Sequence, residues 1–222
     1  DGSRATGTLV ADRLVLTSAD AFSGMILDSG DTAAFSWSSR AGGSGASVWT
    51  ASEWELFPGY QPFAADGGAT APSQRGFLIL VLDQPVEGIP PVVINAGTLA
   101  VESYRKLVGY PHDLYLPGDS RSDAIHASGS GEAVPAVFGQ VEGRLFHTGD
   151  LKAHGGAEGA PVFSFFDGVW SMDAMVVGYD AVEGGALVLE LDTVARDFIA
   201  SAVNAREAEV EASDATSLSQ DV

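Results

Sequence analysis

The chain has 222 residues, is rich in glycine, contains no cysteine and carries a formal net charge of −19. Its length suffices for one large β domain or two small ones, and such a strongly acidic protein would be repelled by nucleic acids and by anionic membrane surfaces. The absence of cysteine excludes disulfides and thiolate metal sites. We therefore expect no nucleic-acid partner, and no membrane span because no stretch approaches roughly 18 consecutive apolar residues.

Short β-branched or aromatic runs, bounded by Gly, Asp, Ser and Pro, make up most of the chain. This pattern is typical of an all-β sandwich or barrel. We predict strands over residues 8–17, 76–82, 107–110, 161–166, 174–179 and 186–191. A stretch containing several prolines, residues 84–97, lies near the middle and is predicted to connect two halves of similar size.

The pattern changes to that of a helix near the C-terminus. Val194, Phe198, Ile199 and Val203 follow one another at the spacing of an apolar stripe, which predicts a helix over residues 192–205. Asp192 or Thr193 is expected to cap its first turn. Residues 206–222 are acidic and then rich in Ser and Thr, and we expect them to form a solvated tail or linker.

Several segments, in chain order, carry a resemblance to a known family. They are GTLVADRLVLTSADAF (7–22), ELFPGYQP (55–62) with RGFLILVLDQPV (75–86), LVGYPHD (107–113) and GGAEGAPVF (155–163). The segments resemble the chymotrypsin-like (trypsin-like) serine protease superfamily, in particular its bacterial glutamyl-endopeptidase branch. The resemblance implies two six-stranded Greek-key β-barrels, over residues 1–95 and 96–191, with residues 192–205 as the closing helix.

All three positions of the family's catalytic triad carry a different residue in this chain. In that frame the general base falls on Asp20, the orienting aspartate on Gly76 and the nucleophilic serine on Glu158. Serine-protease chemistry needs a hydroxyl, a base within reach of it and a carboxylate that orients the base. The four histidines (His112, His126, His147 and His154) all lie outside the base's frame. We therefore expect no peptidase activity.

The segment around Glu158 nevertheless keeps the glycines that the family uses to form its oxyanion loop. By resemblance, the vestigial loop comprises Gly156, Ala157 and Glu158, and the Glu158 carboxylate is expected to accept the amide of residue 156 or 158 within about 3.2 Å. The resemblance also implies a binding cleft formed by Val176, Val177, Gly178, Tyr179, Asp180 and His154. Peptide capture there requires an exposed backbone edge at residues 176–180.

The family geometry would make Asp20 and Glu158 close neighbours. Two adjacent carboxylates share a proton, bind a cation between them or turn apart into solvent. Two carboxylates are too few ligands for a calcium ion, so we predict no metal and no cofactor.

Three functions are compatible with these features. The first is a pseudoprotease, a non-catalytic module that binds a protein or peptide. The second is a hydrolase of a non-peptide bond that uses Asp20 and Glu158 as an acid and base pair. The third is an interaction or adhesion module of a longer secreted protein. The resemblance implies a bacterial protein that is secreted or periplasmic.

Overall fold

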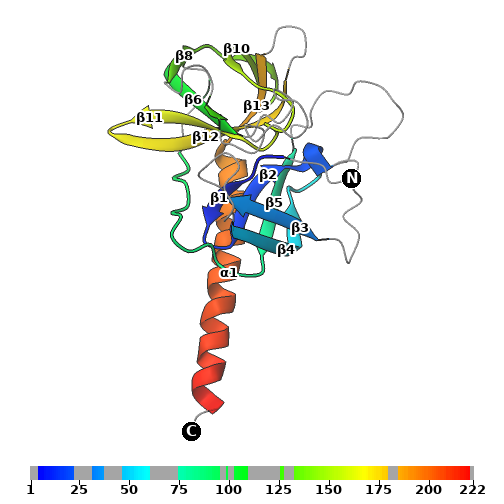
Figure 1. Ribbon diagram of the computed structural model, residues 1–222, viewed down its shortest axis with the longest axis vertical. Coiled ribbons are helices and arrows are strands. Elements are labelled where there is room, and N and C mark those ends of the chain that lie inside the picture. The colour runs from blue at the N-terminus through cyan, green and yellow to red at the C-terminus, as the bar shows by residue number, and fades with distance from the viewer. Residues whose placement is uncertain are drawn as a thin grey trace, which may run out of the picture.

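The computed structural model describes residues 5–22, 32–37, 47–60, 75–95, 99, 103–109, 126–127, 133–179 and 185–220. Two curled antiparallel sheets form half-barrels, and a single C-terminal helix runs beside them (Figure 1). The prediction of a mostly β chain with a C-terminal helix is confirmed. Six strands per barrel and Greek-key connections stay a prediction.

The N-terminal sheet contains five strands in the order β1-β2-β5-β4-β3. They are β1 (Thr8–Ala11), β2 (Leu14–Ser18), β3 (Ala33–Trp37), β4 (Ser47–Leu56) and β5 (Phe77–Leu82), and a short 3₁₀ helix, η1 (Ala19–Phe22), follows β2. The strand predicted over residues 8–17 is therefore two strands of a hairpin. All six residues of β5 are buried because this strand lies in the middle of the sheet and is covered on both faces, which explains its uninterrupted apolar sequence.

The C-terminal sheet has the order β7-β6-β11-β12-β13-β10-β9, and β8 also pairs with β6. Its strands are β6 (Ser103–Gly109), β7 (His126–Ala127), β8 (Val134–Ala136), β9 (Gly139–Glu142), β10 (Leu145–Lys152), β11 (Pro161–Phe166), β12 (Val169–Tyr179) and β13 (Gly185–Glu190). Asp167 and Gly168, with φ angles of 49° and 82°, form the tight turn between β11 and β12. An Asp-Gly pair suits this turn because both residues tolerate positive φ.

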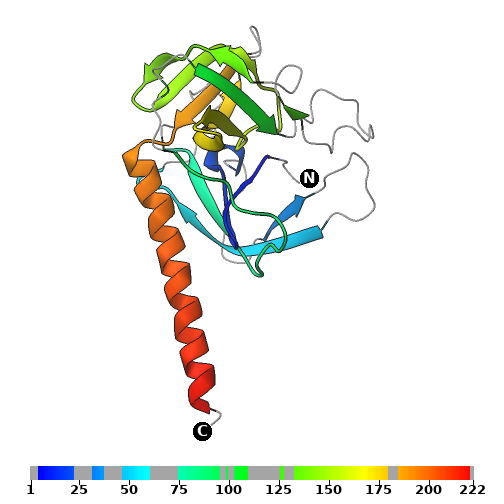
Figure 2. The same cartoon turned by 90° about the vertical axis from the view of Figure 1, so that its left-hand side faces the viewer.

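The helix α1 (Thr193–Gln220) is longer than predicted. Asp192 caps it, since its Oδ1 accepts the amide of Ala195 at 2.9 Å. The predicted end near residue 205 is wrong, because the Ala and Glu residues that follow favour a helix and Arg206 pairs with Glu209 at 2.7 Å. Figure 2 shows the second half of α1 projecting away from both sheets. Within the described part of the chain, no helix is both long and apolar enough to cross a membrane.

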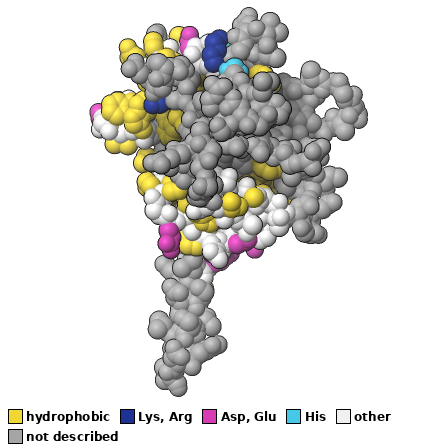
Figure 3. All heavy atoms as spheres, in the orientation of Figure 1, with side chains coloured by type: hydrophobic (Ala, Val, Ile, Leu, Met, Phe, Trp, Pro, Cys, Tyr) yellow, Lys and Arg dark blue, Asp and Glu magenta, His cyan; other side chains and the backbone are white. Residues whose placement is uncertain are grey.

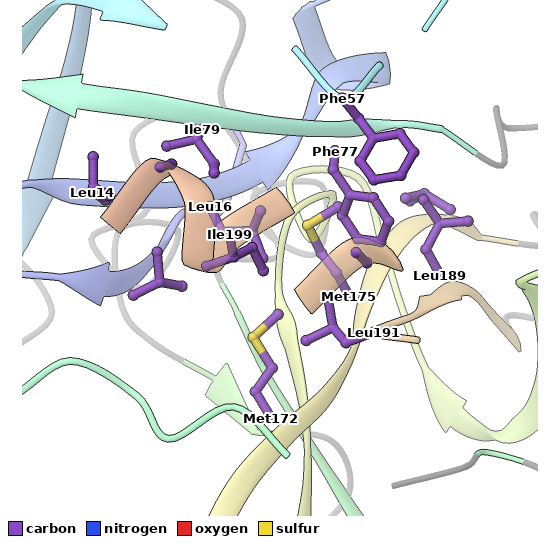
Figure 4. Close-up of a cluster of buried hydrophobic side chains, with 14 of the residues drawn as sticks. Leu14, Leu16, Phe57, Phe77, Ile79, Met172, Met175, Leu189, Leu191 and Ile199 are labelled. Atoms are coloured by element: carbon purple, nitrogen blue, oxygen red, sulfur yellow. The ribbon is translucent and has the colours of Figure 1, made fainter. Parts of the chain in front are cut away.

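A shared hydrophobic core joins the two sheets and the first turns of α1. Figure 4 shows Leu16 and Phe77 from the N-terminal sheet beside Met175 and Leu189 from the C-terminal sheet, with Ile199 of the helix packed among them. All five side chains are at most 3% exposed. The junction between the sheets is therefore a packed interior, and loops at its edge have a fixed support. The division of the chain at residue 95 stays a prediction.

Candidate functional site

The three positions that the resemblance assigns to a catalytic triad lie on segments that meet at the junction of the two sheets. Asp20 lies in η1, directly after β2, and Gly76 directly precedes β5. The amide of Ala19 donates to the carbonyl of Gly76 at 2.8 Å, which joins these two segments. Glu158 lies in the loop between β10 and β11, on the C-terminal sheet.

The loop that carries Glu158 packs directly against the end of β2. Gly159 has a φ of 87°, and a Cβ atom built on it would lie 2.5 Å from Thr17 Oγ1 and 3.1 Å from the amide nitrogen of Ser18. Gly156 has a similar φ of 88°. Only glycine takes this backbone conformation without strain, and only glycine allows so close an approach. The backbone conformation therefore requires glycine at both positions, and the contact with β2 requires it at Gly159.

Glu158 folds back onto its own loop. Its Oε2 accepts the backbone amide of Gly156 at 2.9 Å, within the distance expected from the sequence. The loop is tightened by two turns, in which Ala157 donates to the carbonyl of His154 at 2.9 Å and Ala160 donates to that of Ala157 at 2.8 Å. The half-buried Glu158 carboxylate thus supplies an acceptor to the amide of Gly156, which is a buried residue.

An N-terminal segment holds the loop from the other side. The amide of Thr6 donates to the carbonyl of Glu158, and its hydroxyl donates to the carbonyl of Gly156, both at 2.8 Å. Thr17 Oγ1 in turn donates to the carbonyl of Thr6 at 2.8 Å. The sequence reading missed Thr6, because a threonine about 150 residues before its partners gives no local signal.

Asp20 has a partner of its own. The hydroxyl of Tyr60 donates to Asp20 Oδ1 at 3.1 Å. Burial, followed by the negative charge of Asp20, raises the pKa of Tyr60 well above its usual range. Tyr60 therefore stays protonated and remains a donor to the carboxylate. The carboxylates of Asp20 and Glu158 thus each accept from a protein donor, whereas the third arrangement considered for them placed both in solvent.

The predicted cleft strand is the end of β12. The last bonds that tie it to the 154–160 loop are Gly159 N to Val176 O at 2.7 Å and Val176 N to Ala160 O at 2.9 Å. Beyond Val176, no described strand pairs with β12 on this side, while β13 pairs with it on the other. Val177 is buried, Gly178 is half-buried and Tyr179 is exposed. Asp180 and the loop 181–184 lie outside the described residues.

Other polar residues near this junction lie within strands or in the turns of the loop. Ser164 and Ser171 are buried in β11 and β12. His154 is half-buried and contributes its carbonyl to the turn described above. Among the residues that the structure describes, no three His, Asp or Glu side chains gather as they would around a metal ion. The sequence reading also missed a buried ion pair in the C-terminal sheet, Arg105 Nη1 to Asp173 Oδ2 at 2.6 Å.

No protein-family model matches the sequence, and no curated protein shows a significant match to it. The fold and the site define a mostly β protein of two half-barrels with a glycine-rich loop at their junction. Its function is therefore argued from that geometry.

Proposed function

We propose that the protein is a catalytically inactive homologue of chymotrypsin-like serine proteases that binds an extended peptide or protein segment at the end of β12. The main support for the proposal is the loop at residues 156–159. It keeps glycines with positive φ at positions 156 and 159, as the family's oxyanion loop would need. Glu158 stands at the position of the nucleophile, and its carboxylate accepts the amide of Gly156. Two curled sheets that meet at this loop support the same assignment.

The proposed lack of peptidase activity follows from the residues at the three triad positions. Glu158 offers no hydroxyl, Gly76 offers no carboxylate, and Asp20 is engaged by Tyr60. A carboxylate that attacked an amide would form an anhydride, which is a poor route to peptide cleavage. The alternative of an acid and base pair is less supported, because the carboxylates of Asp20 and Glu158 each have their own donor.

Incubation with casein, with peptide and ester substrates and with a fluorophosphonate probe is expected to give no turnover and no labelling. The variant Glu158→Ser should also remain inactive, because the new hydroxyl would have no base to remove its proton. Trypsin run in parallel provides the positive control. Turnover by the wild-type protein, or labelling of any of its residues, contradicts the inactive assignment.

The binding surface is the backbone edge of β12 together with the 156–159 loop. A peptide that pairs with this edge as an added strand would exchange main-chain hydrogen bonds with it. Titration of the ¹⁵N-labelled protein with a mixture of extended decapeptides should shift the amide resonances of Gly156, Gly178 and Tyr179. Shifts confined to residues remote from the loop and from β12 contradict this location.

Glu158 is expected to compete with a bound peptide for the amide of Gly156. Replacement by alanine frees that donor, and one net hydrogen bond is worth about 1 kcal/mol, which corresponds to about fivefold tighter binding. Glu142→Ala, on the exposed strand β9, removes the same charge elsewhere and should leave the affinity unchanged. Weaker binding by Glu158→Ala would show that the carboxylate contacts the peptide instead.

A further inference from the structure

A second candidate site adjoins the N-terminal segment. It is an apolar cavity of about 170 Å³ between residues 6–9, the connection at residues 86–92 and one face of β6 and β11. Its apolar wall includes Leu9, Val92, Val108, Pro161 and Phe163. No charged side chain lies among its described lining residues. The cavity therefore suits a hydrocarbon group and offers nothing to a charged one.

The same face of the C-terminal sheet continues from the cavity to an exposed aromatic cluster. Side chains of alternate residues point to one side of a strand, so the cavity residue Phe163 shares its face with Phe165 on β11. Phe165 pairs with Trp170 on β12, and their ring centroids are 5.0 Å apart. Tyr104 follows on β6, and the three rings are 62% (Tyr104), 52% (Phe165) and 40% (Trp170) exposed. Figure 3 shows hydrophobic side chains gathered over the β11–β12 hairpin.

A positive charge lies midway along this apolar surface. Lys106 is the register partner of Phe163, and its Nζ lies 5.8 Å from the ring centroid of Trp170. It is one of only two lysines, with Lys152, in a chain of net charge −19. The Lys106 ammonium thus lies on the apolar surface between the cavity and the aromatic cluster, in a protein whose net negative charge otherwise repels anions.

We propose that this surface, from the cavity to the aromatic cluster, binds an anionic amphiphile with a single aliphatic chain. The end of the chain fills the cavity, its remainder lies along Phe163, and the head group meets Lys106. The cavity is smaller than the roughly 300–1,000 Å³ of sites for drug-sized ligands, which suits the end of a chain. From Val108 to Lys106 the strand rises about 7 Å, which is the distance along β6 between the cavity and the residue that meets the head group.

A peptide is a poor candidate for this site, because the site lies on the face of the sheet and not at its edge. A peptide backbone needs partners for its N–H and C=O groups, and these are supplied by the edge of a sheet rather than by its face. An aliphatic chain has no such requirement. The proposal uses residues other than those of the peptide cleft, so either one can fail without the other.

Calorimetric titration with dodecanoate, below the concentration at which it forms micelles, tests the proposal. We expect one molecule to bind, with much weaker binding of hexanoate, whose chain is too short, and of dodecyltrimethylammonium, whose charge is opposite. Lys106→Gln should weaken dodecanoate binding about tenfold, as for the loss of a charged hydrogen bond, whereas Lys152→Gln is the matched control and should bind normally. Val108→Trp, which fills the cavity, should abolish binding.

Thermal unfolding of each variant establishes that it is folded before its affinity is measured. If Val108→Trp does not fold, the affinity of Lys106→Gln still tests the proposal, because Lys106 is only half-buried and its replacement should leave the fold intact. Three results would overturn the proposal: no binding of dodecanoate, equal binding of the cationic amphiphile, or an unchanged affinity in Lys106→Gln. Sedimentation at several protein concentrations gives a further check. A stable dimer that excludes dodecanoate would assign the aromatic cluster to a second copy of the chain and overturn the proposal.

Discussion

Gly159→Ala is expected to destabilise the protein by about 4 kcal/mol, which sums the strain of a left-handed backbone and the cost of overpacking. The new methyl group would overlap the carbonyl oxygen of Thr6 and crowd Thr17 Oγ1 and the amide of Ser18. Those atoms belong to backbone and to a buried hydroxyl, so they have little room to move. Gly168→Ala is the matched control, because Gly168 has a similar φ of 82° but no atom within 4 Å of a Cβ at this position.

Chemical denaturation monitored by tryptophan fluorescence measures both free energies of unfolding. The control should lose only about 1 kcal/mol, the cost of the backbone conformation alone. The difference between the two variants then reports the contact between the loop and the N-terminal sheet. Equal losses would mean that the 156–159 loop does not press against β2, and the site described at this junction would have to be abandoned.

Features with a local signature could be predicted from the sequence. The strand β11 has the predicted bounds, residues 161–166, because an apolar run ends there at an Asp-Gly turn. The predicted capping of α1 by Asp192 is also confirmed. The contact of Glu158 with the amide of Gly156 follows from the resemblance of residues 155–163 to the oxyanion loop of the serine protease family, and the structure contains it.

Features that depend on distant contacts could not be predicted. β4 was not identified because most of its side chains are exposed or half-buried, so its sequence lacks a clear apolar alternation. The donors Thr6 and Tyr60 come from segments far from their acceptors. The length of α1 differs from the prediction for another reason. Acidic residues are common both in disordered tails and in helices, and the Ala and Glu residues after position 205 have high helix propensity.

The buried pair of Arg105 and Asp173 is the clearest case of a feature hidden from sequence reading. Asp173 is the extra residue of a β-bulge in β12, opposite the bond between Val162 and Phe163 in β11. The bulge turns its side chain into the sheet, where the Asp173 carboxylate and Arg105 are 1% and 4% exposed. The regular alternation of a strand, which is all that the sequence offers, does not reveal the bulge and so does not give the orientation of the Asp173 side chain.

Arg105→Met is expected to cost about 3–5 kcal/mol, because it leaves a carboxylate buried without its cation. Burial already raises the pKa of Asp173, and the charge of Arg105 and a hydrogen bond from Ser164 offset part of the rise. Without Arg105 that pKa rises further, and the native state holds a proton that the unfolded chain, with a pKa of about 3.9, releases. Stability of the variant relative to wild type should therefore fall as the pH rises from the raised pKa of Asp173 in the wild type to its still higher pKa in the variant.

Urea denaturation at pH 5 and at pH 8 measures this dependence, and the loss should be larger at pH 8. The double variant Arg105→Met/Asp173→Leu removes both charges and should recover much of the stability, with no extra loss at pH 8, because a hydrophobic pair of similar volume avoids the desolvation of two ions. A double variant as unstable as the single one would show that Arg105 acts mainly through its packing over Phe138, whose ring centroid lies 5.9 Å from the guanidinium. In that case the ion pair would contribute little, and the bulge at Asp173 would need another explanation.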